Sequence, residues 1–175
     1  MISIKIPLIG FVAYSGTGKT TLLLKMIPLL KEKGLRLGVI KHSHHDFEID
    51  YPGKDSYRLR QAGAEQLLIA SRQRRAFIVE EKNKESEEVY LNQCLPFLED
   101  APLDLILVEG FKHERFPKIE VHRSSLGRPL MFPEDDSIIA IACDAPLVLT
   151  TSLPTLDMNN PREIIKFIEE YILHQ

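Results

Sequence analysis

The stretch Ala13-Tyr14-Ser15-Gly16-Thr17-Gly18-Lys19-Thr20 decides the fold of this 175-residue chain. It follows an apolar run from Ile6 to Ala13 and opens a segment of helical periodicity. Gly16 and Gly18 let backbone N–H groups turn toward an anion, where a larger residue would strain the loop. A helix that begins at Lys19 directs the positive end of its dipole to the same place. The stretch therefore predicts a phosphate-binding P-loop, with Ala13 at the position of the first glycine.

The side chains of this loop have expected parts in binding a nucleotide. Lys19 supplies a positive charge for the β- and γ-phosphates, both in binding and in catalysis. The Thr20 hydroxyl is placed to bind Mg²⁺, and Thr21 can meet the α-phosphate. The expected nucleotide-binding residues of the loop are Ser15, Gly16, Thr17, Gly18, Lys19, Thr20 and Thr21.

A P-loop protein also needs a carboxylate for the metal at the end of a neighbouring strand. Glu109 ends the apolar run from Leu103 to Val108. We expect it to hold the metal together with Thr20, through a metal-bound water because glutamate is longer than the usual aspartate. Gly110 could present an N–H to the γ-phosphate. The alternative is a strand that simply ends in an acid.

The rest of the chain alternates strand-like and helix-like segments, which is typical of an α/β fold with a largely parallel central sheet flanked by helices. We expect one P-loop nucleotide-binding domain over residues 1–175. The strand Lys118 to His122 alternates polar and apolar residues, which suits an edge or half-exposed strand. The other expected strands are Ile6–Ala13, Leu35–Ile40, Gln66–Ala70, Ala76–Val79, Leu103–Val108 and Ile138–Cys143. The expected helices are Lys19–Lys33 (kinked at Pro28), one that starts near Pro52, Glu85–Leu98 and Pro161–Leu173; Arg123 to Asp136 is the expected long loop.

Composition narrows the class of protein. The net charge of −3, with 44% hydrophobic and 27% charged residues, is that of a globular protein and excludes global disorder. The near-neutral balance argues against nucleic acid as a partner. No apolar run approaches the ~20 residues of a membrane span, and there is no secretory signal, so we expect no membrane partner. Cys94 and Cys143 match neither a metal motif nor a disulfide framework, which indicates a cytoplasmic protein.

The segment Lys41 to Asp46, KHSHHD, has three histidines and follows a predicted strand, so it should lie beside the phosphates. Three interpretations compete. It can be a switch loop in which Asp46 orients the attacking water, a transition-metal site built from His42, His44 and His45, or a solvated loop. The close spacing of the histidines argues against one shared ion.

Five segments, taken in order, resemble the molybdopterin-guanine dinucleotide biosynthesis adaptor family, MobB. They are AYSGTGKTTL, IKHSHHD, PGKDSYRLRQAGA, LILVEGFKHE and IAIACDAP. The resemblance implies a homodimeric GTP-binding protein with weak GTPase activity. Such proteins assist MobA, the nucleotidyltransferase that attaches GMP to molybdopterin to form the guanine dinucleotide. In that family the cleft for nucleotide or cofactor is lined by the segments that correspond to Ala13–Thr21, Lys41–Asp46 and Glu109–Lys112.

Guanine preference does not follow from the residues, because the usual Asn/Thr-Lys-x-Asp signature is absent. Asp144, just after the predicted strand Ile138–Cys143, is the best substitute, since a carboxylate can accept from guanine N1–H and the N2 amino group. The alternative is a turn acid before Pro146.

Positive charges for phosphate groups are available elsewhere in the chain. Lys112, His113 and Arg115 could contact phosphate on a pterin or the partner. An arginine acting from a second subunit could be Arg72, Arg74 or Arg75.

Two other functions remain open at this point. A P-loop small-molecule kinase would transfer the γ-phosphoryl group to a bound hydroxyl, and a lid helix rich in arginine would favour it. A non-catalytic metal or pterin carrier would use the histidine loop. The resemblance favours an accessory GTP-binding protein. Its hydrolysis should be slow, because positioning without a trans-acting cation gives low rates.

Overall fold

The computed structural model describes residues 5–43, 47–80 and 89–173 and divides the chain into two compact units. The larger unit comprises Met1–His42 and Tyr90–Gln175, and the smaller unit comprises Ser43–Val89. A single domain over residues 1–175 stays a prediction. None of the helices within the described residues is long and apolar enough to cross a membrane.

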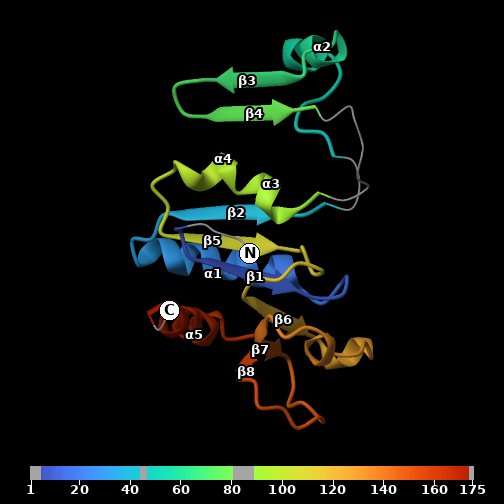
Figure 1. Cartoon of the computed structure of the whole chain (residues 1–175), viewed down its shortest axis with the longest axis vertical. Coiled ribbons are helices and arrows are strands. Elements are labelled where there is room, and N and C mark those ends of the chain that lie inside the picture. Colours follow the sequence, from blue (N-terminus) through green and yellow to red (C-terminus); the bar gives the residue numbers. More distant parts are fainter. Residues whose placement is uncertain (1–4, 44–46, 81–88, 174–175) are drawn as a thin grey trace. The chain divides into compact units, whose positions relative to one another are not determined.

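The larger unit is built on a parallel sheet, which confirms the predicted fold class. Its described strands are β1 (Leu8–Val12), β2 (Leu37–Lys41), β5 (Leu105–Glu109), β6 (Lys118–His122), β7 (Ile138–Cys143) and β8 (Thr155–Asp157). They pair in the order β2-β5-β1-β6-β7-β8, and every neighbouring pair is parallel (Figure 1). All carboxyl ends therefore lie at one edge, with the end of β1 between those of β5 and β6. The short strand β8 was not predicted.

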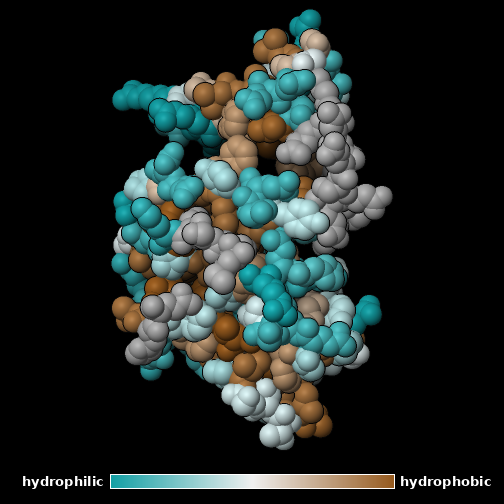
Figure 2. Space-filling view, viewed as in Figure 1, coloured by the Kyte–Doolittle hydropathy of each residue, from teal (hydrophilic) through white to brown (hydrophobic). Residues whose placement is uncertain are grey.

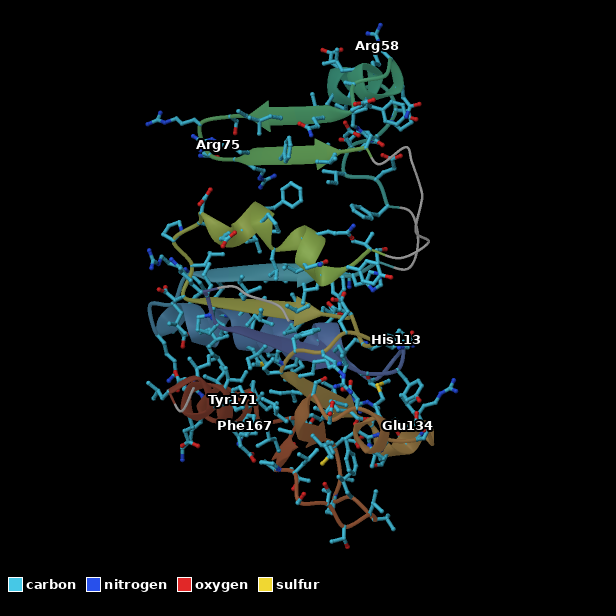
Figure 3. All side chains as sticks on the ribbon, viewed as in Figure 1. Arg58, Arg75, His113, Glu134, Phe167 and Tyr171 are labelled. Carbon is cyan, nitrogen blue, oxygen red and sulfur yellow. The ribbon has the colours of Figure 1, made fainter. Side chains whose placement is uncertain are left out.

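Two long helices and the sheet enclose the main core. These are α1 (Lys19–Glu32) and α5 (Pro161–Leu173), which pack against each other and against β1, β5 and β6. Figure 3 labels the stacked pair Phe167 and Tyr171 on α5. After α1, Gly34 adopts a φ of +86°, the left-handed conformation expected just beyond a helix end. The buried residues that α1 and α5 contribute are Leu22, Leu23, Met26, Leu30, Ile164, Ile165 and Ile168.

A second apolar cluster joins two short helices to β2 and β5. The helices are α3 (Leu91–Cys94) and α4 (Pro96–Glu99), and Leu91 and Leu95 are buried against Ile106 and Val108. The predicted continuous helix Glu85–Leu98 is wrong in its described part, because Tyr90 is extended and the helical run is interrupted at Leu95. Pro96 lacks the N–H that would continue the first helix. Residues 81–88 lie outside the described residues.

The prediction for β6 as an edge or half-exposed strand is wrong. β6 lies between β1 and β7, and Lys118 and Glu120 are 0% and 1% exposed. Buried charges of this kind require partners, and both residues have them: Lys118 Nζ donates to the carboxylate of Asp135 at 2.5 Å, and Glu120 accepts two backbone N–H groups. Polar–apolar alternation looks the same whether the polar side chains meet water or protein.

The loop between β6 and β7 is long and turn-rich, as predicted. It contains two short 3₁₀ helices, η1 (Ser124–Leu126) and η2 (Phe132–Glu134). Its second half is tied to the sheet by Glu120, which accepts from the N–H groups of Met131 (2.8 Å) and Phe132 (2.9 Å).

Over its described residues, the smaller unit contains one helix and one hairpin. The helix α2 (Asp55–Gln61) precedes β3 (Gln66–Ala70) and β4 (Arg75–Val79), which pair antiparallel. Arg60 is 8% exposed and forms ion pairs with Glu48, Asp50 and Glu80. These pairs connect α2 to the segment before it, which carries Glu48 and Asp50, and to Glu80, the residue that follows β4.

Candidate nucleotide-binding site

The P-loop connects the carboxyl end of β1 to α1, as predicted. Gly16 and Gly18 have φ angles of +80° and +101°, a region that favours glycine. Thr17 is buried, and its hydroxyl donates to Tyr14 O at 2.9 Å. Its side chain therefore stabilises the turn from within, and its backbone N–H also donates to Tyr14 O, at 3.4 Å.

Lys19 lies in the first turn of α1, beside other positive charges. Its Nζ donates to Ala13 O at 3.1 Å, back across the loop. Burial lowers the pKa of Lys19 from its ordinary value of 10.5; the charge of Glu109 opposes this effect, whereas those of Lys41 and Lys112 add to it. Three lysine ammonium groups therefore act on this edge of the sheet, where a polyphosphate would bring compensating negative charge.

The structure brings Thr20 and Glu109 together although 89 residues separate them. Thr20 Oγ1 donates to Glu109 Oε1 at 2.8 Å, and Lys41 Nζ lies 3.0 Å from the same oxygen. The parallel register explains the meeting, because Glu109 on β5 is level with Phe11 on β1 and Lys41 on β2. Each of these residues ends its strand or nearly so, at the edge that carries the P-loop.

A hydroxyl and a carboxylate are suitable ligands for Mg²⁺. This ion takes oxygen ligands and is commonly held by one or two carboxylates together with substrate phosphates and water. Within the described residues, no group of three or more His, Cys, Asp or Glu side chains could hold a metal by itself. The donor set thus fits an ion that arrives with a phosphate ligand.

The segment after Glu109 differs from expectation. Gly110 N donates to Phe11 O at 3.2 Å, so this N–H continues the sheet and does not serve a γ-phosphate. Gly110 and Phe111 have φ angles of +101° and +52°, and a Cβ on Gly110 would lie 2.8 Å from Cβ of His42. The Phe111 ring stacks on the His42 ring with centroids 4.6 Å apart. This strained turn joins the ends of β5 and β2 beside the candidate metal ligands.

The histidine loop is described only at its beginning. His42 N donates to Glu109 O at 2.8 Å, which places this residue next to the site. His44, His45 and Asp46 lie outside the described residues. The three interpretations of the loop therefore stay open, and the proposed catalytic role of Asp46 stays a prediction.

The other predicted cations lie in both units. In the larger unit, Lys112 O accepts from Lys118 Nζ at 3.0 Å, and Arg115 pairs with Asp136 at the surface. Figure 3 shows His113 in the loop that follows β5. In the smaller unit, Arg75 begins β4 at the hairpin turn, next to Arg72 and Arg74.

On the other side of the P-loop, the end of β7 carries Asp144. Its Oδ1 accepts from Ser124 N at 2.9 Å, and its Oδ2 lies 3.5 Å from Arg123 Nη1. Arg123 Nε in turn donates to Thr17 O at 3.2 Å. Asp144 is therefore connected to the P-loop through Arg123.

Sequence reasoning missed Arg123 and Arg128 as residues of the site. Arg128 lies over the Tyr14 ring, 5.7 Å from its centroid. The sequence did show that Arg123 directly follows the predicted strand Lys118–His122. This position indicates a site residue only once β6 is known to pair with β1, the strand that leads into the P-loop.

A family model, curated relatives and solved structures each point to one family. The family model for MobB, described as molybdopterin guanine dinucleotide synthesis protein B, matches residues 8–144. A molybdopterin-guanine dinucleotide biosynthesis adapter protein from Escherichia coli is 48% identical over 171 residues, covering 97% of this chain and 95% of the relative. The protein of the same name from Haemophilus influenzae is 42% identical, covering 97% of this chain and 92% of the relative. The crystal structure of Bacillus subtilis MobB matches with a TM-score of 0.72 at 22% identity, over 94% of this chain and 98% of that chain, which supports the fold.

Proposed function

The chain belongs to the molybdopterin guanine dinucleotide synthesis protein B family, and from this premise we propose that it is a GTP-binding adaptor in the synthesis of that cofactor. The observation that carries the nucleotide part of the proposal is the contact between Thr20 and Glu109 beside Lys19. A P-loop with a hydroxyl–carboxylate pair at its edge is suited to a nucleoside triphosphate with Mg²⁺.

The phosphates would lie on the loop from Ser15 to Thr21. Backbone N–H groups and the N-terminus of α1 supply partial positive charge, and Lys19 supplies a full charge. Thr20 and Glu109 would hold Mg²⁺, which neutralises phosphate charge when it is bound. The ion pair with Lys41 and the hydrogen bond from Thr20 hold the Glu109 carboxylate at this position.

Hydrolysis would be slow and secondary to the adaptor role. A water oxygen forms a bond to the γ-phosphorus while the bond from that phosphorus to the bridging oxygen breaks, giving GDP and inorganic phosphate. Lys19 stabilises the charge that develops, and Asp46 is our candidate for positioning the water. Within the described part of the larger unit, no arginine bonds to Thr20 or Glu109, the residues of the metal side. An arginine contributed in trans typically accelerates such reactions by about 10³–10⁵, so an intrinsic rate without one would be low.

The nucleoside end would lie on the β7 side of the loop, beside Asp144. β5 with Glu109 stands on one side of β1, and β6 and β7 stand on the other. The metal and the terminal phosphate therefore belong to the β5 side, which leaves the β7 side for the base. Asp144 is 18% exposed in its side chain, and a carboxylate there can accept the paired N–H donors of guanine.

The partners follow from the family and from one surface. We propose that the protein assists a MobA-type nucleotidyltransferase, contacts molybdopterin or its guanine dinucleotide form, and works in the cytoplasm as a homodimer. Leu68 and Phe77 are 61% and 47% exposed and lie opposite each other on β3 and β4. Figure 2 shows hydrophobic surface among hydrophilic surface at the level of these strands. Such a surface favours an association, and the molar mass from light scattering tests the dimer.

Calorimetric titration with GTP and with ATP, each with and without Mg²⁺, tests the nucleotide proposal. We expect Mg²⁺-dependent binding with a preference for GTP. Lys19→Ala should weaken binding by about 100-fold, or about 2.8 kcal/mol, and Lys25→Ala, an exposed lysine of the same helix, should not. Unaltered binding by Lys19→Ala would overturn the P-loop assignment. A preference for ATP, with transfer of the γ-phosphoryl group to a hydroxyl compound, would favour a kinase.

A further inference from the structure

The guanidinium of Arg123 lies against the outside of the P-loop. Its Nε donates to Thr17 O at 3.2 Å, and its Nη2 lies 3.4 Å from the position that a Cβ on Gly18 would take. Arg123 is the first residue after β6, whose carboxyl end lies beside that of β1. The contact is thus set by the sheet, and the side chain has a short path to the loop.

This contact fixes the orientation of one peptide group in the loop. The peptide between Thr17 and Gly18 is planar and trans, so its C=O and its N–H point in opposite directions. A donor that holds Thr17 O on the outside therefore holds the Gly18 N–H toward the inside. No group within the described residues accepts a hydrogen bond from the Gly18 N–H. Inward N–H groups of this kind are what an anion-binding loop needs.

Asp144 holds Arg123 in place. Its carboxylate lies 3.5 Å from Arg123 Nη1 and is itself fixed by the Ser124 N–H at 2.9 Å. A guanidinium has five N–H donors, of which two have acceptors here, those on Nε and Nη1. The Arg123 side chain is 36% exposed, so its other donors are accessible to water.

The loop that follows Arg123 touches the P-loop a second time. Arg128 lies over the ring of Tyr14, and the loop beyond it is anchored where Glu120 accepts two backbone N–H groups. Two guanidinium groups therefore contact the P-loop, one at Tyr14 and one at Thr17. Both add positive potential next to the place where phosphates would bind.

We propose that Arg123, held by Asp144, is a positioning residue that directs the Gly18 N–H toward a bound phosphate. The proposal rests on the proposed function, since it assigns the phosphate of a nucleotide as the anion. It also gives Asp144 a role that is independent of the base. An interaction with the phosphate region must affect GTP and ATP alike, because the two share that region.

Two measurements on the full chain test this role. The first is calorimetric affinity for Mg²⁺ complexes of GTP and ATP, in the wild type, Arg123→Gln, Arg123→Lys and the control Arg162→Gln, an exposed residue of α5. Since a hydrogen bond to a charged group contributes ~1.5–3 kcal/mol, Arg123→Gln should weaken both nucleotides equally, by about 10- to 100-fold. Arg123→Lys should restore part of the loss, because it keeps the charge without the planar fork. Arg162→Gln should bind as the wild type does.

The second measurement is the amide NMR resonance of Gly18 in the nucleotide-free protein. Arg123→Gln and Asp144→Asn should both move it, and the double variant should move it no further than Arg123→Gln alone. A wild-type Gly18 resonance with wild-type affinity in Arg123→Gln would overturn the proposal. If the wild type binds no nucleotide, the proposed function fails, whereas the Gly18 resonance still decides the role of Arg123. If Arg123→Gln does not fold, the same comparison is made with Arg123→Lys.

Discussion

Replacing Lys118 with methionine removes a charge from the interior of the larger unit. Lys118 is fully buried, and its Nζ donates to Asp135 Oδ2 at 2.5 Å, to Glu114 O at 2.6 Å and to Lys112 O at 3.0 Å. Methionine keeps an unbranched side chain of similar length, so little packing is lost next to Gly10, where a Cβ would come within 2.7 Å of Lys118 Cγ. The change therefore isolates the ion pair and its hydrogen bonds.

The magnitude follows from burial of the pair. Removing one partner of a buried ion pair costs about 3–5 kcal/mol, because the other charge stays without compensation. The Asp135 side chain is 20% exposed, so water offsets part of this cost, and we expect a loss near 3 kcal/mol. Domains of ordinary size are stable by about 5–15 kcal/mol. The expected loss would therefore be a large share of the free energy of unfolding.

Urea denaturation followed by circular dichroism measures this loss. With a slope of about 1–3 kcal/mol per molar, the midpoint should fall by roughly 1–3 M. Lys33→Met is the control, because its ion pair with Glu169 is 2.8 Å long but exposed, and such pairs contribute ~0–1 kcal/mol. Adding Asp135→Asn to Lys118→Met should recover part of the stability. A loss below about 1 kcal/mol in Lys118→Met, equal to the control, would refute the reasoning.

Three further predictions concern the site and its surroundings. Glu109→Gln should weaken the Mg²⁺ dependence of nucleotide binding more than the binding itself, measured by titration with and without the metal; an unchanged dependence would remove Glu109 from the metal site. Asp144→Asn should narrow the difference in affinity between GTP and ATP, and an unaltered ratio would contradict base reading by this residue. Burial raises the pKa of Asp135, but hydrogen bonds from Lys118 and Ser137 and the charge of Lys118 lower it more, so it lies below the ordinary 3.8. Its contribution to stability is therefore complete above that value and is lost as the pH falls through the lower folded-state pKa. Thermal unfolding from pH 5 to pH 2 should show a smaller acid loss for Asp135→Asn than for the wild type, and equal losses would be inconsistent with this assignment.

The P-loop was predictable because its signals are local. A buried strand, two glycines and a helix start all lie between Leu8 and Glu32, and the φ angles of +80° and +101° at Gly16 and Gly18 need no distant partner. The meeting of Thr20 with Glu109 was also foreseeable, since parallel strands end at one edge of their sheet. Asp104, which precedes β5 at the opposite edge of the sheet, accepts hydrogen bonds from Arg36 and lies away from the candidate metal site.

The two wrong predictions, for β6 and for the helix Glu85–Leu98, arose because a hydrophobic pattern alone is compatible with more than one structure. The pattern of β6 is that of a strand with one wet face, yet Lys118 and Glu120 are covered by loops whose backbone groups replace water. The helix predicted up to Leu98 is interrupted because one proline outweighs the apolar spacing around it. Neither outcome can be read from a window of residues.

By itself, the sequence determined the class of fold, the P-loop and the acid that faces it, because each depends on hydrophobic period, backbone freedom at glycine, or the common edge of a parallel sheet. Only the tertiary structure decided which charges are buried and which loops meet. Arg123 and Asp144 are 21 positions apart in the chain, and Asp144 is connected to Thr17 through Arg123 because β6 lies between β1 and β7. Contacts between distant segments depend on strand order, which is chosen by packing of the whole unit and leaves no periodic signal in the chain.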